Sequence, residues 1–329
     1  MSTKNVTIEE RKAYLDQLMR EYEESKPEIG DSVSYYADFE NYLRTAKVED
    51  SLKSGSDKEG GYLVPNEYHE KLIQKLEDEH VIRKLATVFT ADHNISIPGV
   101  SKHGEADWIS EGVPYPESDE EFNGIELGAH KNGCITIVTD ELLEDSAFSI
   151  EDYLVETAGG KLARLEEEAF LCGDGINKPR GVFLDAEAIN EVEEITMDDA
   201  IDLYYGLKQC YRKNAVWVMS DDVYSKLVKV RTVAGIDHNL WEGGLQDEKP
   251  ITLLGRPVYI STLMPEKAPD NVAIAFGDFS YYWIGERGNM SVKRLNEKYA
   301  DTGMVGFRVT HRVNGKLVLP EAVKTIKYK

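Results

Sequence analysis

The longest periodic pattern in the chain lies between residues 150 and 172, and it predicts a helix. Ser149 can cap its start, and Glu151 and Asp152 fall in the first turn, where the helix dipole favours acids. At about 1.5 Å per residue this helix would span roughly 35 Å. Its apolar stripe is expected at close to helical spacing, at Ile150, Leu154, Ala158, Leu162, Leu165 and Ala169.

Two adjacent glycines, Gly159 and Gly160, interrupt this pattern. A glycine inside a helix costs about 1 kcal/mol relative to alanine. The pair therefore marks either a bend or a close contact with another backbone, and both residues are hinge candidates.

The first 59 residues differ from the rest, because they are polar and charged with few large apolar groups. Helical spacing is loose over residues 6–24, and residues 51–61 have the composition of a flexible linker. A second amphipathic piece contains Tyr35, Tyr36, Phe39, Tyr42 and Leu43. Helices this short are not stable alone. They must pack on the body, pack on a neighbouring chain, or remain mobile.

From residue 60 onward, helix and strand patterns both occur. The stretch 102–131 is rich in Gly, Pro and acids, and it predicts a long hairpin that projects from the body. Asn314-Gly315 predicts a hairpin turn. We further expect a helix at 66–80, strands at 133–138, 215–219 and 272–276, long strands at 290–295 and 306–312 joined by a polar loop, and a last strand at 322–328.

Charge and composition exclude several classes of function. The 329-residue chain carries 38 basic and 60 acidic residues, a net charge of −22, with no basic block. Binding to a phosphate backbone needs clustered Lys and Arg, so direct nucleic-acid binding is not expected. The acidity serves either solubility or repulsion of nucleic acid. No apolar run reaches the roughly 18 residues of a membrane span. Three widely spaced cysteines argue against a disulfide framework or zinc site and for a reducing compartment.

Motifs for catalysis are weak. Gly173-Asp174-Gly175 lacks the Gly-Lys-Ser/Thr of a phosphate loop and predicts a tight turn after the helix. The histidines show no paired metal spacing. One carboxylate cluster consists of Asp140, Glu141, Glu144 and Asp145. It could hold Mg²⁺ or perform acid–base chemistry. Alternatively, it is an acidic helix start on a solvated face or one side of an inter-chain salt bridge.

Several short pieces, each weak alone, occur in an order and spacing that are specific together. With these pieces the sequence resembles the major capsid (coat) proteins of tailed double-stranded DNA bacteriophages, the Hong Kong ninety-seven-like family, over about residues 58–329. The pieces are Gly60-Gly61-Tyr62-Leu63-Val64-Pro65, the stretch 108–120, the stretch 139–146 before the long helix, Gly173-Asp174-Gly175 with Pro179 and Gly181, the stretch 253–258, Gly277-Asp278-Phe279, and the late Phe307-Arg308, Arg312 and 320–324.

The resemblance implies the α+β phage coat fold and a division of the chain. Residues 1–59 would be an N-terminal arm or scaffold-like segment. Residues 60–176 would form a peripheral domain, with an extended loop at 102–131 and a spine helix at 150–172. Residues 177–286 would form an axial domain. Residues 287–329 would return to the peripheral domain, with the last strand joining the axial domain.

Two sets of residues would then contact neighbouring subunits. In the peripheral loop, Asn296, Asp301 and Thr302 are expected to reach the three-fold contacts. Some members cross-link through a lysine of the extended loop, but no lysine lies between Lys102 and Lys131, so we predict no isopeptide cross-link. The extended-loop contacts would be Trp108, Glu111, Pro114, Tyr115, Pro116 and Glu117, with Tyr115 about where that lysine would be.

The implied function is self-assembly through hexamers and pentamers into an icosahedral shell that encloses phage DNA without sequence-specific binding. The shell would assemble in the host bacterial cytoplasm and become the virion capsid. Portal, scaffold, maturation protease and decoration proteins would be further partners, with no membrane, cofactor, metal or catalytic residue. Two rivals remain open: an encapsulin-type nanocompartment shell with the same fold, and a metal-dependent hydrolase that uses the carboxylate cluster.

Overall fold

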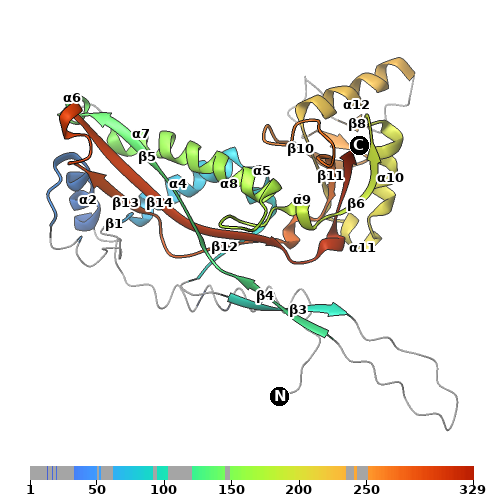
Figure 1. Ribbon diagram of the computed structural model, residues 1–329, viewed down its shortest axis with the longest axis horizontal. Helices are drawn as coiled ribbons and strands as arrows, with labels where there is room; N and C mark the ends of the chain where they lie inside the picture. The colour runs from blue at the N-terminus through green and yellow to red at the C-terminus, as the bar shows by residue number, and fades with distance from the viewer. Residues whose placement is uncertain are drawn as a thin grey trace, which may run out of the picture.

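A computed structural model describes residues 13, 17, 20, 33–49, 52, 62–91, 95–102, 121–144, 149–234, 241–242 and 251–329. The molecule is elongated, and its two main sheets lie toward opposite ends (Figure 1). No helix among these residues has the length and apolar character needed to cross a membrane.

The first sheet has six strands and is organised around one long strand, β14 (Met304–Leu317). One edge of β14 pairs with β13 (Ser291–Leu295) and then with β12 (Tyr282–Glu286). Its other edge pairs with β5 (His130–Thr139). Two short strands from the N-terminal half complete the sheet, because β1 (Tyr62–Leu63) pairs with β13 and β2 (Thr87–Thr90) pairs with β12.

Helices cover one face of this sheet. The predicted helix at 66–80 is confirmed as α4 (Asn66–Glu79), and it is followed by the short α5 (Val81–Leu85). The amphipathic piece with the tyrosines forms α2 (Val33–Thr45), and its apolar side is buried on the body. The predicted helix at 6–24 lies outside the described residues, except for Ala13, Gln17 and Arg20, which are helical.

The predicted spine helix is continuous but not uniform. It begins as α7 (Ile150–Leu154), widens into the π-helix η1 (Val155–Gly159) and continues as α8 (Gly160–Cys172). The Ser149 cap is confirmed, because its hydroxyl accepts a hydrogen bond from the Asp152 N–H at 3.2 Å. Leu165 was wrongly placed in the apolar stripe, since it is 48% exposed. The π turn rotates the following residues, so that Glu166, Phe170 and Leu171 face inward instead.

The second sheet has seven strands in the order β6-β15-β11-β7-β10-β9-β8. The expected strands at 215–219, 272–276 and 322–328 are confirmed as its central members. The strands are β6 (Glu187–Val192), β7 (Val216–Met219), β8 (Trp241–Glu242), β9 (Thr252–Leu253), β10 (Arg256–Ile260), β11 (Val272–Gly277) and β15 (Val323–Tyr328). Helices α10 (Met197–Gly206), α11 (Gln209–Arg212) and α12 (Asp221–Ala234) accompany this sheet (Figure 1).

A shared hydrophobic cluster joins the two sheets. It combines Val216 and Val218 of β7 with Ile284 of β12 and Val313 of β14. Phe170 of the spine helix belongs to it as well and is fully buried. The link between the sheets also includes the short helices α9 (Val182–Asp185), η2 (Phe279–Tyr281) and η4 (Pro320–Ala322).

A two-stranded hairpin leaves the body below the first sheet in the view of Figure 1. It consists of β3 (Ile95–Lys102) and β4 (Glu121–Leu127). Pro98 and Gly99 lie inside β3 and pair with β4, which Pro98 can do because this ribbon has free edges. The extended-loop residues between the two strands, Trp108, Glu111, Pro114, Tyr115, Pro116 and Glu117, lie outside the described residues.

The predicted hairpin turn at Asn314-Gly315 is wrong. Both residues lie within β14, opposite Gly285 and Ile284 of β12. A Cβ at position 315 would lie 2.3 Å from the hydroxyl oxygen of Tyr282, so glycine is needed for close approach and not for a turn.

Candidate functional site

One end of the first sheet presents the predicted contact residues that lie in the described part of the chain. We call it the tip: the end of β5, the short helix α6 (Asp140–Glu144) and the tip loop 296–303 between β13 and β14 (upper left in Figure 1). Asn296, Asp301 and Thr302 all lie in this loop and are exposed. The structure therefore brings the predicted peripheral-loop residues together on one projecting surface.

The tip loop has a defined conformation. It contains the short helix η3 (Ala300–Thr302), which ends at Gly303 with φ +63°. The Thr302 N–H and hydroxyl both donate to the Tyr299 carbonyl, at 3.1 and 2.9 Å. The Tyr299 ring lies over Gly306, where a Cβ would approach it to 2.6 Å. The Asp140 N–H donates to the Gly303 carbonyl at 3.1 Å, which joins α6 to the end of the loop.

Three exposed apolar side chains at the tip form what we call the tip patch: Ile137, Leu142 and Met304. They are 42%, 43% and 37% exposed. Ile137 and Met304 share one face of the sheet, because Ile137 pairs with Gly306 and Met304 with Thr139. Apolar residues gathered on a projecting surface are typical of a protein–protein contact. The sequence predicted a strand over 133–138, but it did not indicate that Ile137 is exposed.

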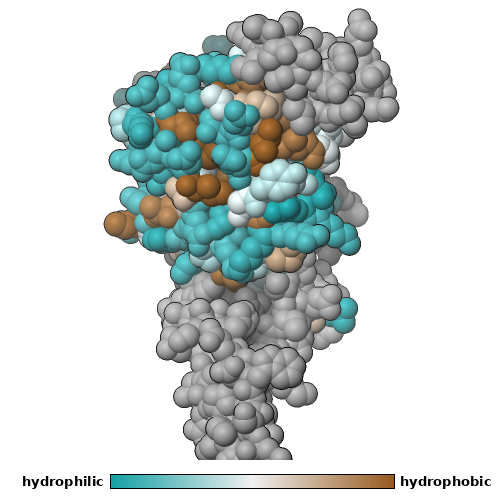
Figure 2. Space-filling model, turned by 90° about the vertical axis from the view of Figure 1, so that its right-hand side faces the viewer, coloured by the Kyte–Doolittle hydropathy of each residue, from teal (hydrophilic) through white to brown (hydrophobic). Residues whose placement is uncertain are grey.

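A second exposed surface lies at the opposite end of the molecule. Figure 2 looks onto this end, where apolar patches lie among hydrophilic ones. The edge strand β6 is exposed along most of its length, and Ile189 on it is 39% exposed. Tyr205 of α10 is 67% exposed, and the Arg212 guanidinium lies 5.3 Å from its ring centroid. A strand that lies at the edge of the sheet among the described residues, beside exposed aromatic and apolar groups, is a second candidate contact surface.

Between these two ends lies the buried charge cluster, defined as Arg83, Glu166, Glu286 and His311. All four side chains are at most 6% exposed. Glu166 accepts from Asn132 at 2.7 Å, and its oxygen lies 2.8 Å from His311 Nδ1. Arg83 lies 3.4 Å from Glu166 and also donates to Glu286. The cluster joins α5, the spine helix, β12 and β14, and sequence reasoning missed it because its members are far apart in the chain.

The charges in this cluster stabilise one another. Burial alone would raise the pKa of Glu166, but His311 and Arg83 together lower it to about 2. Burial would likewise lower the pKa of His311, yet the Glu166 and Glu286 carboxylates raise it. Two carboxylates thus lie beside the Arg83 guanidinium and the His311 ring, which carries a second positive charge when it is protonated, and buried charges are tolerated when they are paired in this way.

The neighbouring Glu167 has a different environment. Its carboxylate accepts from the backbone N–H groups of Val81 and Ile82, at 3.3 and 3.2 Å, and from the Ser261 hydroxyl at 3.3 Å. Burial raises its pKa to about 7, because these hydrogen bonds do not offset the loss of water. Since Ser261 directly follows β10, Glu167 connects the spine helix to the second sheet.

The hinge candidates lie where the spine helix meets α4. Gly159 and Gly160 both have helical backbone angles, so the helix does not break at either residue. A Cβ at position 159 would lie 3.1 Å from Lys75 Cγ and 3.5 Å from Leu72 Cδ2. Gly159 therefore permits close packing of two helices, which was one of the two alternatives open from the sequence.

Three members of the predicted carboxylate cluster lie in α6. Asp140, Glu141 and Glu144 are all exposed, and Asp145 lies outside the described residues. Within the described part of the chain, no group of three or more His, Cys, Asp or Glu residues could hold a metal ion. Gly173-Asp174-Gly175 forms a tight turn after the helix, as predicted.

Comparison with known proteins identifies the family. A family model described as the phage capsid family matches residues 60–328. The chain belongs to the phage capsid family. A curated relative, the major capsid protein of Klebsiella oxytoca phage phiKO2, is 25% identical over 264 residues, which cover 74% of this chain and 60% of that protein. The chain thus spans 60% of the length of this relative.

Solved structures agree with the family. The capsid protein of a native GTA particle is 28% identical and has a TM-score of 0.63, with 75% of this chain and 89% of that chain covered. An encapsulin, SrpI from Synechococcus elongatus PCC 7942, is 12% identical with a TM-score of 0.56, over 75% of this chain and 86% of that chain. At that identity the encapsulin shows the fold alone. The α+β coat fold expected for the phage capsid family is confirmed.

Proposed function

We propose that this chain is the major capsid protein of a tailed double-stranded DNA phage. It assembles through hexamers and pentamers into an icosahedral shell that encloses phage DNA. The observation that carries this proposal is the phage capsid family match over residues 60–328, in an elongated fold with an exposed surface at each end. Many weak contacts of this kind, repeated over many copies, hold a shell together.

The domains follow from the same proposal. Residues 1–59 form the arm, 60–176 the peripheral domain and 177–286 the axial domain, and 287–329 return to the peripheral domain before the last strand joins the axial domain. The separate hydrophobic clusters of the two sheets support two domains, but β12 (Tyr282–Glu286), which this division assigns to the axial domain, pairs within the first sheet. The tip then contacts copies around three-fold positions, and the surface at β6 and α10 contacts copies within a ring.

The remaining predicted contact residues belong to the extended loop. Trp108, Glu111, Pro114, Tyr115, Pro116 and Glu117 would lie on the adjacent subunit. Gly159 and Gly160 would absorb small changes of angle between hexamers and pentamers. The hairpin of β3 and β4, which leads away from the body toward this loop, supports an overlap between subunits (Figure 1).

We also propose that the protein acts without catalysis and encloses DNA without recognising its sequence. The net charge of −22 supports weak interaction with the packaged DNA. Assembly would take place in the host bacterial cytoplasm, with portal, scaffold, maturation protease and decoration proteins as partners, and would place the protein in the virion capsid.

An encapsulin-type shell is the second candidate, because the SrpI encapsulin shares the fold. The long charged leader, residues 1–59, favours the phage capsid. The two functions differ in what the shell contains, since one encloses DNA and the other encloses protein cargo.

Negative-stain microscopy of the purified protein tests the proposal. Closed polyhedral shells or capsomer rings are expected, and intact-mass analysis of the same sample would report whether the leader is retained. A uniform small oligomer, even with phage partners co-expressed, would contradict the proposal. Cargo enzymes in shells purified from the native host would favour the encapsulin instead.

A further inference from the structure

We propose that α2 is a permanent part of the assembled subunit and that Arg294 is a positioning residue that uses α2 to fix the tip loop. The inference rests on the proposed function for its statements about assembled shells and about the contacts of the tip with neighbouring copies. It concerns residues 33–52, which precede the region matched by the phage capsid family.

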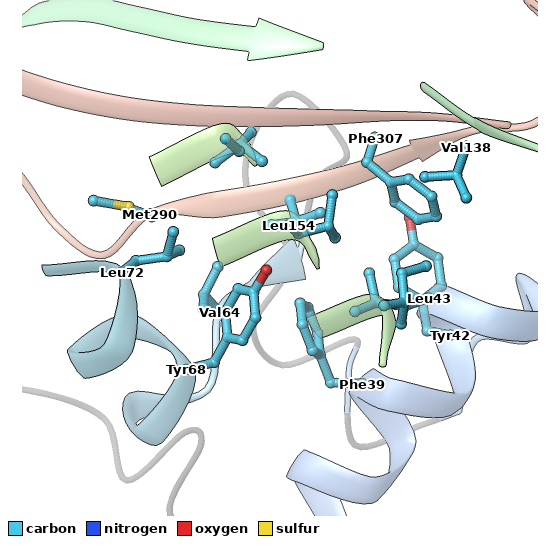
Figure 3. Close-up of a cluster of buried hydrophobic side chains, with 14 of the residues drawn as sticks. Phe39, Tyr42, Leu43, Val64, Tyr68, Leu72, Val138, Leu154, Met290 and Phe307 are labelled. Carbon is cyan, nitrogen blue, oxygen red and sulfur yellow. The ribbon is translucent and has the colours of Figure 1, made fainter. Parts of the chain in front are cut away.

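The first observation is how deeply α2 is built into the hydrophobic core. Tyr35, Phe39, Tyr42 and Leu43 are only 3%, 3%, 5% and 1% exposed. Figure 3 shows the last three pointing into a cluster with side chains of α4, the spine helix and the first sheet. Burying one large apolar side chain contributes about 1.5–3 kcal/mol. Leu52, after the helix, is fully buried in the same cluster.

Specific aromatic and polar contacts orient the helix. The rings of Tyr42 and Tyr62 meet edge to face with centroids 4.7 Å apart, and those of Phe39 and Tyr68 lie 6.0 Å apart. The Tyr36 hydroxyl donates to Glu151 in the first turn of the spine helix. These contacts define a single docked position, which distinguishes α2 from a loosely attached leader.

Arg294 connects this helix to the tip loop. Its backbone N–H donates to the Tyr42 hydroxyl at 2.9 Å, and its Nη1 donates to the Leu43 carbonyl at 2.6 Å. Carbonyls in the last turn of a helix lack intrahelical partners, so a cation there is favourable. The same guanidinium donates through Nε to Asn296 Oδ1 at 2.6 Å and lies 6.0 Å from the Phe307 ring centroid.

This connection matters because the two ends of the tip loop are fixed in different ways. The Gly303 end is held by the Asp140 N–H through the backbone. Asn296, at the other end, is held by the Arg294 side chain. A hollow of about 540 Å³, lined by residues of α2 and α6 and by Arg294, lies between the two helices. The guanidinium thus spans from α2 to the loop along this hollow.

The consequence concerns the leader. A cut between residues 52 and 62 would remove α2 together with both of its bonds to Arg294 and expose the apolar cluster beneath. We therefore expect the subunit in finished shells to retain residues 33–52, so that any processing ends before Val33.

Amide hydrogen exchange and intact mass test the inference on the full-length chain. In unassembled subunits, Arg294→Ala should raise exchange in residues 297–303 about tenfold or more, and shell yield should fall. Arg294→Lys keeps the charge but not the two directed bonds, so it should show a smaller increase. Arg312→Ala, a half-buried arginine elsewhere on β14, is the matched control and should leave exchange in the tip loop unchanged.

Two results would overturn the inference. One is an Arg294→Ala subunit whose tip loop exchanges amide hydrogens at the same rate as in the wild type. The other is finished shells in which the mass of the subunit lacks residues 33–52. If Arg294→Ala does not fold, Arg294→Lys provides the comparison, because it also loses the directed side-chain bonds to Leu43 and Asn296. The exchange measurement needs no shells, so its outcome is separate from a failure of the proposed capsid function.

Discussion

Adjacent glutamates on the spine helix, Glu166 and Glu167, have opposite pKa shifts because they face different surroundings. Glu166 faces Arg83 and His311, and its pKa is lowered to about 2. Glu167 faces two backbone N–H groups and a hydroxyl, and burial raises its pKa to about 7. Successive helical positions point about 100° apart, so one residue step moves the carboxylate out of the charge cluster.

The raised pKa of Glu167 predicts a specific pH dependence. The folded protein holds a proton on this carboxyl that the unfolded chain releases near its ordinary pKa of 4.5. The resulting stability is fully present below that value and is lost as pH rises through about 7. Glu167→Gln keeps only one of the two accepting oxygens and cannot ionise. Between pH 5 and pH 8 its free energy of unfolding should therefore rise by about 1–3 kcal/mol relative to that of the wild type.

Urea unfolding of unassembled subunits between pH 5 and pH 8 measures this difference. Glu168→Gln, at the exposed neighbouring position, is the control and should follow the wild type at every pH. A constant difference between Glu167→Gln and the wild type across this range would contradict the assignment.

The lowered pKa of Glu166 predicts the opposite dependence of stability on pH. Its lowered pKa contributes stability that is present above the ordinary value of 4.5 and is lost as pH falls toward about 2. Glu166→Gln leaves Arg83 and His311 with one carboxylate in a buried site, so it should destabilise the subunit by about 3–5 kcal/mol at pH 7. Denaturant unfolding at pH 7 checks the loss. A double-mutant cycle with His311→Gln should give a clear coupling energy, and simple additivity would show that the two side chains act independently.

At the scale of elements, the spine helix combines a π turn with a glycine, Gly159, that faces Leu72 and Lys75 of α4. The glycine permits this contact, while the wider turn changes which residues face inward. The two features together place the charged residues of α8 at the junction of the sheets.

Substitutions at Gly159 separate its packing role from the proposed hinge role. Gly159→Ala should change the free energy of unfolding by less than about 1 kcal/mol, because the Lys75 side chain can move and alanine favours the helix. Gly159→Leu should destabilise by about 2 kcal/mol or more, because it pushes α4 away. Thermal unfolding measures both. A stable Gly159→Ala subunit that forms rings but no closed shells would show that glycine is needed as a hinge.

Local patterns predicted most elements correctly, because caps and apolar spacing act within a few residues. Ser149 caps the spine helix as its sequence context indicates. The predictions failed where the role of a residue depends on contacts with residues that are distant in the sequence. Gly315 suggested a turn, but its role is set by Tyr282, which packs against it from β12. Arg294 carries no motif at all, and its importance depends on α2, which lies some 250 positions earlier in the chain.

At the scale of the whole molecule, the tip patch predicts that assembly and folding can be separated. Ile137→Asp combined with Met304→Asp places charges on exposed positions, so the subunit melting temperature should change by only a few degrees. Shell yield should fall about tenfold or more, because each repeated contact loses apolar burial and gains repulsion. Light scattering and microscopy measure the yield. Lys131→Glu, an exposed charge change on the same strand, is the control, and normal shells from the double variant would contradict the role of the patch.

The pairing of the first sheet has a consequence for how the protein is made. Strands β1, β2 and β5 come from the N-terminal half, but their partners β12, β13 and β14 lie between residues 282 and 317. A ribosome adds about 5–20 residues per second, so these early strands wait roughly 10–50 s for their partners. During each round of translation the nascent chain exposes unpaired strand edges and apolar side chains. The yield of this protein in a cell therefore depends on how well chaperones protect the nascent chain during that interval.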